Sequence, residues 1–219
     1  MAQLTPIRLI AGLGNPGSEY VRTRHNAGFR FVDALAAKTG GRFREEGKFK
    51  GEICRVRLAG EEVWLVKPLT FMNCSGECVA AVAGYYKIKP EEVLVVHDEM
   101  DLLPGCMRLK LGGGNAGHNG LKSVSAQFGT PNFWRLRLGI GHPRTLGLAQ
   151  QVFDFVLSSP NAEQDAGLTE CIEAALPTAA LWAEGDMTKA QRAIAGYSAP
   201  KKPEAKDGKA ADKPAAKLG

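Results

Sequence analysis

The pattern of apolar and polar positions along the chain predicts alternating strands and helices. Short apolar runs that end in turns rich in glycine, proline or polar residues predict strands, whereas apolar residues spaced three or four apart predict helices. The predicted strands are Ile7 to Leu13, Glu52 to Leu58, Val63 to Val66, Val93 to Val96, Cys106 to Leu111 and Phe133 to Ile140. The predicted helices are Asn26 to Ala36, a helix that contains Val79, Val82, Ala83 and Tyr86, Asn119 to Phe128, Asn161 to Leu181, and Asp186 to Ala195. This mixture favours a single α/β domain with a mixed, twisted β-sheet flanked by helices.

Local signals sharpen several of these elements. The second and third strands flank the turn Ala-Gly-Glu-Glu, which predicts an antiparallel hairpin. The all-apolar run Val93 to Val96 is typical of a central strand covered on both faces. Asn26 is suited to cap the first helix, and Asn73 or Ser75 is suited to cap the second.

Composition excludes several classes of protein. The chain has 219 residues, 44% of them hydrophobic, so it can bury a core without a disulfide or metal staple. Its five cysteines are odd in number and contain no C-x-x-C, which favours reduced thiols over a disulfide framework or a zinc site. The N-terminus lacks the pattern of a signal peptide, and no apolar stretch approaches the length of a membrane span. We therefore expect a cytoplasmic protein with no membrane partner.

The net charge of +5 is unevenly distributed along the chain. The segment from Ser198 onward carries six lysines against three acidic residues, which predicts a disordered tail over 198–219 behind a domain over 1–197. No Asp or Glu occurs between Asp101 and Asp154, an interval that contains Arg108, Lys110, Lys122, Arg135, Arg137 and Arg144. This polarisation indicates a polyanion-binding face, although the same six residues would also suit an ordinary solvated surface.

The stretch GLGNPG after the first strand matches the glycine pattern of a dinucleotide-binding loop. That motif requires a helix opening at the third glycine, a parallel βαβ return and an acidic residue at the end of the second strand. Here Pro16 precedes the third glycine, the helix begins about nine residues late, and a hairpin follows. We therefore expect no nicotinamide or other cofactor, and the side chains of the loop become the candidates for function.

A histidine and an aspartate follow or end two predicted strands. His25 lies beyond the first strand and Asp98 ends the fourth, and open α/β sheets place ligands outside the carboxyl ends of their strands. A carboxylate that orients an imidazole makes it a competent general base, but His25 could also be a hydrogen-bonded structural histidine. Asn15, Asn73 and Asn119 are predicted at the same edge, where uncharged amides can hold a carbonyl group or a water molecule.

Other catalytic patterns are missing from the sequence. There is no G-x-S-x-G and no H-E-x-x-H, and the three glycines after Leu111 lack the Lys-Ser/Thr of a P-loop. His97, Asp98 and Glu99 together with His118 lack a recognised metal-ligand spacing. We therefore expect no metal.

Six motifs, in this order, resemble those of the bacterial-type peptidyl-tRNA hydrolases: GLGNPGSEY, TRHNAGF, KPLTFMNCSG, VVHDEMDLLPG, LKLGGGNAGHNGLKS and FWRLRLGIGHP. The likeness extends from about Ile7 to Tyr197. It implies a single α/β domain that hydrolyses the ester between a peptide and tRNA, with the acceptor arm and 3′ end of peptidyl-tRNA as its partner. The implied residues are His25 as catalytic base with Asp98 as its support, Asn15, Tyr20, Phe71, Asn73 and Asn119 at the substrate, and Arg108, Lys110 and Arg137 at the tRNA.

Two positions depart from the family pattern. Asn115 stands where the family often has a histidine, and Arg108 stands where a lysine is common. Arg108 keeps the charge, whereas Asn115 removes an imidazole.

Two other functions remain open at this point. One is a non-catalytic RNA-binding module in which His25 and Asp98 are structural, and the other is a metal-dependent hydrolase or phosphorylase. Release of only the N-blocked amino acid from aminoacyl-tRNA distinguishes an enzyme from the first, and activity in excess EDTA distinguishes it from the second. The sequence does not specify an oligomer, and we expect a monomer. We also expect it to act on tRNA and not on DNA.

Overall fold

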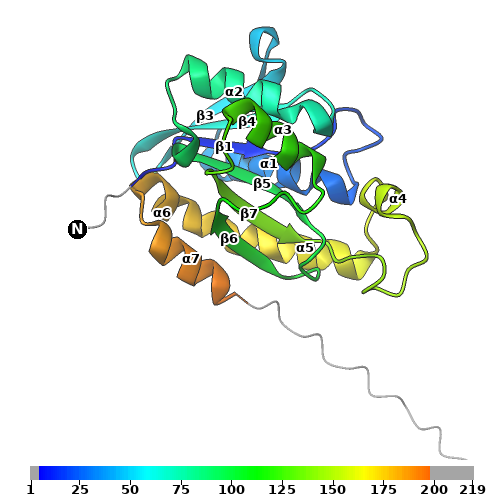
Figure 1. Ribbon diagram of the computed structural model, residues 1–219. Helices are drawn as coiled ribbons and strands as arrows, with labels where there is room; N and C mark the ends of the chain where they lie inside the picture. Colours follow the sequence, from blue (N-terminus) through cyan, green and yellow to red (C-terminus); the bar gives the residue numbers. More distant parts are fainter. Residues whose placement is uncertain (1–4, 198–219) are drawn as a thin grey trace, which may run out of the picture.

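A computed structural model of the chain describes residues 5–197, which form one seven-stranded β-sheet (Figure 1). The strand order is β2-β3-β4-β1-β5-β7-β6. The strands are β1 (Leu9–Gly12), β2 (Arg44–Glu46), β3 (Gly51–Leu58), β4 (Glu61–Pro68), β5 (Val93–Glu99), β6 (Met107–Leu111) and β7 (Trp134–Gly139). The four central strands are parallel, while β2–β3, β3–β4 and β6–β7 pair antiparallel. The fold class is therefore confirmed, whereas the predicted tail over 198–219 lies outside the described residues.

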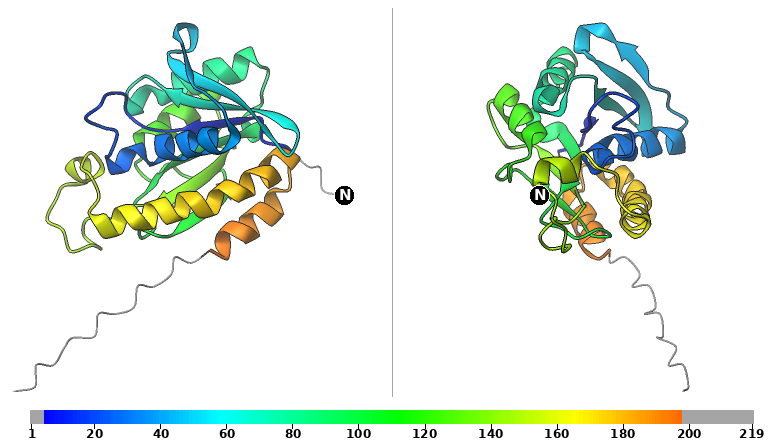
Figure 2. Two further views of the ribbon diagram at one scale, coloured as in Figure 1. Left: turned by 180° about the vertical axis from the view of Figure 1, so that it is seen from behind. Right: turned by 90° about the vertical axis from the view of Figure 1, so that its right-hand side faces the viewer.

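Helices cover both faces of the sheet. The helices are α1 (Ala27–Thr39), α2 (Ser75–Tyr85), α3 (Asn119–Phe128), α4 (Val152–Val156), α5 (Ala162–Ala175), α6 (Ala179–Glu184) and α7 (Met187–Ala195). Helices α2 and α3 lie on one face, and α1 and α5 to α7 lie on the other (Figures 1 and 2). Of the helices in this part of the chain, none is long and apolar enough to cross a membrane.

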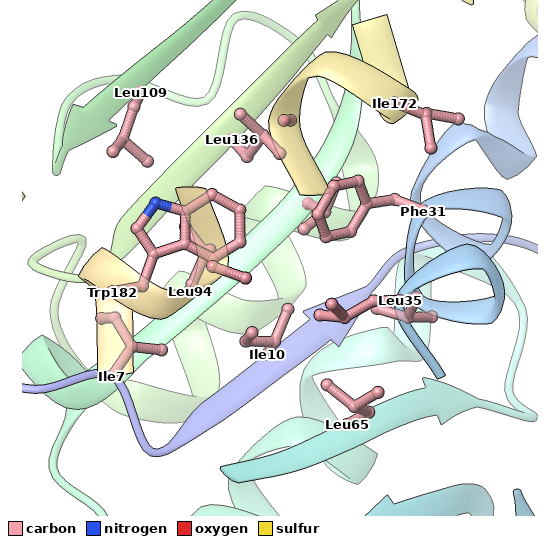
Figure 3. Close-up of a cluster of buried hydrophobic side chains, with 14 of the residues drawn as sticks. Ile7, Ile10, Phe31, Leu35, Leu65, Leu94, Leu109, Leu136, Ile172 and Trp182 are labelled. Carbon is pink, nitrogen blue, oxygen red and sulfur yellow. The ribbon is translucent and has the colours of Figure 1, made fainter. Parts of the chain in front are cut away.

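Alternation of side chains along the strands gives each face its own hydrophobic core. Ile10, Leu94 and Leu136 point to the α1 and α5–α7 side, where Phe31 and Trp182 fill the centre with their rings 5.8 Å apart (Figure 3). The neighbouring strand residues point to the α2 and α3 side, so β1 and β5 are buried on both faces. This double burial confirms the prediction of a central strand from the run Val93 to Val96.

The parallel strands end at one edge of the sheet, and this edge positions the polar loops. The loop after β1, the turn after β4 and the last residues of β5 lie there, and β1 and β5 are direct neighbours. In Figures 1 and 2 the loop after β1 and helix α4 lie at the same end of the molecule. The expected juxtaposition of strand ends is therefore confirmed.

Several local predictions were wrong. The Asn26 side chain does not cap α1, because it bonds the backbone of Asn15. Neither Asn73 nor Ser75 caps α2 with its side chain, since Ser75 Oγ instead donates to the Met72 carbonyl at 2.9 Å. The helix predicted from Asn161 to Leu181 is broken after Ala175, where Leu176–Thr178 form a 3₁₀ turn that contains a proline.

The sequence argument about the first strand also needs correction. Strand β1 does have parallel neighbours, β4 and β5, although α1 leads first into the antiparallel strands β2 and β3. The glycine motif has a packing role. A side chain on Gly12, the first glycine of the motif, would collide with the Gly28 carbonyl in α1, and one on Gly28 would collide with the backbone of Leu13 and Val96. The two glycines together let the start of α1 lie directly on the ends of β1 and β5.

Candidate active site

Asp98 is the centre of a buried hydrogen-bonded group at the end of β5. Its Oδ1 atom lies 2.9 Å from Nδ1 of His25 and 3.1 Å from Nε2 of His118. His25 lies in the 3₁₀ turn η1 (Arg24–Asn26) just before α1, and His118 precedes α3. The close packing of α1 on the strand ends therefore brings His25 to Asp98, and the Gly-rich loop brings His118 to the same oxygen.

The hydrogen bonds determine which nitrogen of each imidazole carries a proton. Nδ1 of His118 accepts from the backbone N–H of Gly120 at 3.1 Å, so its Nε2 bears the hydrogen and donates to Asp98. Because the carboxylate also accepts from Nδ1–H of His25, Nε2 of the neutral His25 keeps its lone pair. Both rings line a cleft, but both nitrogens of His118 are already hydrogen-bonded. Of the two rings, His25 is therefore the one that can take a proton from a ligand.

Electrostatics around Asp98 favour this arrangement. Burial opposes ionisation of Asp98, whose side chain is only 3% exposed, but the two neighbouring histidines hold its pKa well below the usual range. For His25, burial alone would lower the pKa, and the charge and hydrogen bond of Asp98 outweigh it, so the pKa is raised. Burial and the nearby His118 lower the pKa of His97 to about 3, so His97 is neutral and donates from Nδ1 to the Asp98 carbonyl at 2.7 Å.

Asn15 is held rigidly in the loop after β1. The side chain of Asn26 accepts from its backbone N–H at 2.9 Å and donates to its carbonyl at 3.0 Å. The Asn15 side chain in turn accepts from the N–H of Met72 through Oδ1 at 2.8 Å. This bond fixes the orientation of the amide and leaves Nδ2 as the atom that can donate to a bound ligand.

These side chains line a cleft of about 640 Å³. All seven residues predicted at the catalytic and substrate positions contribute to its wall: Asn15, Tyr20, His25, Phe71, Asn73, Asp98 and Asn119. Phe71 is 61% exposed at the rim, although it is a large aromatic residue. The opposite wall is apolar and comes from α4 and the residue after it, namely Val152, Phe153, Val156 and Leu157. The cleft thus combines a polar centre with hydrophobic walls, as small-ligand sites commonly do.

The three predicted tRNA-binding residues lie together outside this cleft. Arg108 and Lys110 are exposed on β6, and Arg137 is the register partner of Arg108 on β7. Their strand neighbours face the α5–α7 core, so all three point to the other side of the sheet. Arg137 is paired with Glu99 at 2.8 Å, and Glu99 also lines the cleft. The basic face and the cleft are therefore adjacent.

One member of the acid-free interval is not available to a ligand. Arg135 is buried and donates to the carbonyls of Gly114 and Gly113 at 2.6 and 2.9 Å, so it supports the Gly-rich loop. Asn115, which stands where a histidine was expected by family likeness, accepts from Ser125 at 3.2 Å and has a similar structural role.

Sequence reasoning missed three contributors to the site. His118 was considered only as a weak metal ligand, Asn26 only as a helix cap, and α4 was not predicted. A signal for His118 existed, because it precedes Asn119 in the Gly-rich loop. The pairing of His118 with Asp98 depends on how that loop folds back, which periodicity does not encode.

Within residues 5–197, one group has the spacing to hold a metal ion. It consists of His25, Asp98 and His118, from which one ligand atom each lies within 4.8 Å of the others. The donor set fits a metal poorly. Nε2 of His118 is protonated because Nδ1 accepts from the backbone, and a protonated nitrogen cannot ligate. Metal binding would require both histidine–aspartate hydrogen bonds to be broken.

Comparison with known proteins identifies the family. A family model described as peptidyl-tRNA hydrolase matches residues 9–204. A peptidyl-tRNA hydrolase of Bordetella petrii is 55% identical over 190 residues, which cover 87% of this chain and 90% of that protein. One of Neisseria gonorrhoeae is 54% identical over 170 residues, covering 78% and 87%. The crystal structure of the Acinetobacter baumannii peptidyl-tRNA hydrolase has a TM-score of 0.85 at 42% identity and covers 90% of this chain and 99% of that one.

Together, the fold, the cleft and these relatives define a class, hydrolases that act on ester bonds. The chain belongs to the peptidyl-tRNA hydrolase family.

Proposed function

We propose that this protein hydrolyses the ester bond between the peptide and the tRNA of peptidyl-tRNA, with His25 as general base and Asp98 as its support. The observation that carries this proposal is the 2.9 Å bond from Nδ1 of His25 to buried Asp98 at the wall of the cleft. This bond orients the imidazole with Nε2 free to take a proton from water. His118 donates to the same carboxylate oxygen and keeps it ionised and correctly aimed.

The reaction needs no covalent enzyme intermediate. His25 Nε2 removes a proton from water, whose oxygen attacks the ester carbonyl to form a tetrahedral intermediate. The protonated imidazole then returns its proton to the departing ribose oxygen, which leaves a free carboxyl group on the peptide and a hydroxyl group on the tRNA. Amides of Asn73 and Asn119, or backbone N–H groups of the cleft, stabilise the oxyanion. No metal takes part, because the proton on His118 Nε2 leaves the histidine–aspartate group unsuited to one.

The nucleic-acid part of the substrate lies on the neighbouring surface. Arg108, Lys110 and Arg137 hold phosphates of the acceptor arm, and Tyr20 or Phe71 stacks with the single-stranded 3′ end. The residues proposed to bind and cleave the substrate all line one cleft of this chain, and we propose that the protein acts as a monomer. Because the tRNA supplies most of the binding energy, the apolar wall of α4 accepts peptides of varied sequence.

The decisive assay compares N-acetyl-aminoacyl-tRNA with the unblocked form. The enzyme is expected to release only the blocked amino acid, since Nδ2 of Asn15 donates to the carbonyl of the blocking group and disfavours a charged ammonium group. Binding of both tRNAs with no release from either would instead indicate an RNA-binding module.

Asn15→Ala and Asn15→Asp separate the two roles of Asn15. Aspartate keeps the acceptor for the Met72 N–H and loses the Nδ2 donor, whereas alanine loses both. We expect each variant to reduce the preference for the blocked substrate by about ten- to a hundred-fold, the effect of one unmade hydrogen bond of about 1–3 kcal/mol. Ratios of kcat/KM for the two substrates measure this. If Asn15→Ala lost the preference and Asn15→Asp kept it, the preference would depend on the hydrogen bond that positions the Met72 loop and not on the Nδ2 donor.

Replacing both Arg108 and Lys110 with glutamine is expected to weaken tRNA binding and to flatten its salt dependence. Each lost phosphate contact changes the slope of log K against log salt concentration by about one. The matched control replaces Lys38 and Arg57, which are exposed cations on α1 and β3, and should leave the slope unchanged. Equal slopes for both double variants would place the tRNA elsewhere.

A further inference from the structure

Arg24 is a buried cation that directly precedes His25 in the chain. Its exposure is only 4%, and its guanidinium group lies 4.1 Å from the centre of the Phe155 ring. Among residues 5–197, no carboxylate lies within ion-pair distance of it. Burial of an unpaired guanidinium costs stability, and burial lowers the pKa of Arg24. Its position beside the proposed base therefore calls for an explanation other than stability.

The acceptors of Arg24 all lie in the segment that runs from α4 to the start of α5. Nη1 donates to the Phe155 carbonyl at 3.2 Å and to the carbonyl and hydroxyl of Ser158 at 3.0 and 2.7 Å. Nη2 donates to Gln164 at 2.6 Å, and the backbone N–H of Arg24 also donates to the Ser158 carbonyl at 3.2 Å. The planar fork of arginine reaches these acceptors from two terminal nitrogens at once, whereas a lysine would have to reach them from a single nitrogen.

The same segment forms the apolar wall of the cleft. Val152, Phe153, Val156 and Leu157 line it, and Phe153 is 72% exposed. Helix α4 has only five residues, and its buried side chains Phe155 and Val156 belong to a small cluster separate from the two main cores. So short a helix is not stable by itself. The hydrogen bonds of Arg24 are thus a main attachment of this wall to the rest of the domain.

We infer that Arg24 is a positioning residue that holds the α4 wall of the cleft in register with His25. The side chain ties the wall to the turn that carries the imidazole, so the distance between the bound acyl group and Nε2 of His25 depends on it. A merely structural role would change only the stability of the fold. The interpretation in terms of substrate rests on the proposed function, while the mechanical link between Arg24 and α4 does not.

The test uses Arg24→Lys and Arg24→Met in the full chain. Hydrogen exchange should become at least about tenfold faster at the amides of Phe155, Leu157 and Ser158, which are hydrogen-bonded within α4 and its final turn, with exchange in β5 unchanged. The kcat for N-acetyl-aminoacyl-tRNA should fall about tenfold or more with a smaller change in KM, because misplacement of the wall moves the ester away from Nε2 of His25 while the tRNA still binds. Arg24→Lys should recover less than half of the loss seen in Arg24→Met when both losses are expressed as logarithms.

Arg30→Met is the matched control. Arg30 lies six residues further on, and its side chain joins α1 to α5 by donating to Asp165 and Thr169 at 2.7 and 3.0 Å. It should leave kcat, KM and α4 exchange unchanged. Ser158→Ala removes one acceptor of Arg24 and also the donation of the hydroxyl to the Phe155 carbonyl at 2.8 Å. It should speed α4 exchange to a smaller extent than the Arg24 variants and serves if those variants do not fold. Unchanged α4 exchange in the folded Arg24 variants would overturn the inference, whether or not the enzyme is active. If those variants showed faster α4 exchange but the wild-type protein had no hydrolase activity, only the proposed function would be overturned.

Discussion

Replacing His25 with alanine is expected to lower kcat for peptidyl-tRNA hydrolysis by about 10²- to 10⁴-fold, the usual contribution of a general base. No neighbouring imidazole can substitute for it. Nε2 of His118 is committed to Asp98 and its Nδ1 to the Gly120 amide, and His97 is buried beneath them. The loss should appear in single-turnover kinetics at saturating enzyme, so that weaker binding does not contribute.

The control for this variant is His142→Ala, because His142 lies outside the cleft and its side chain accepts from the Arg144 backbone N–H at 3.2 Å. Circular dichroism and the melting temperature Tm should show that both variants keep the fold, since His25 is not part of either main core. Wild-type kcat in folded His25→Ala would remove His25 from the mechanism and leave the cleft without an identified base.

Replacing Asp98 with asparagine is expected to lower kcat by about 10²-fold or more and to shift the pH profile to lower pH. In the wild type, the raised pKa of His25 means that the neutral base is lost as pH falls through a value above 6.5. Asparagine removes the charge that raises this pKa and leaves burial, which lowers it. The acidic limb of the kcat/KM profile should therefore move below pH 6.5 in the variant, although the rate on the plateau is lower.

The two parts of this prediction test different claims. The loss of rate tests whether Asp98 stabilises the imidazolium that forms during catalysis, and the shift of the acidic limb tests whether its charge controls the protonation of His25. An acidic limb that stays in place or moves to higher pH would show that another group titrates. The amide introduced by Asp98→Asn would still offer an oxygen to both histidines, so the geometry of the site should be preserved.

His25, Asp98, Asn15 and Asn73, the polar residues that the sequence placed at one edge of the sheet, share the property that they follow or end a strand. Because parallel strands end at one edge, this local feature was enough to bring His25 and Asp98 together with Asn15 and Asn73. The glycines of GLGNPG match the pattern of a phosphate-binding motif, which the sequence context already argued against, for a structural reason. Their pattern reflects a tight turn and the close approach of α1, which a dinucleotide-binding loop also requires.

The residues that were missed or misassigned depend on contacts between distant segments. Arg135 resembles its neighbour Arg137 in the sequence, yet one is buried against the Gly-rich loop and the other is paired at the surface with Glu99. Asn26 precedes a helix and so has the position of a cap, but its side chain satisfies the backbone of Asn15 instead. In both cases the side chain binds a partner that is distant in the sequence instead of taking the role that its local position suggests.

The sequence by itself determined the α/β class, the central strand, the edge of the sheet that carries the cleft and the pair His25 and Asp98, because hydrophobic periodicity and strand ends are local properties of the chain. Only the tertiary structure decided that His118 shares the carboxylate, which nitrogens carry protons, and that α4 closes the cleft and is tied to Arg24. Those features arise where loops far apart in sequence meet, and a hydrogen bond forms there only after packing has placed donor and acceptor within about 3 Å of each other.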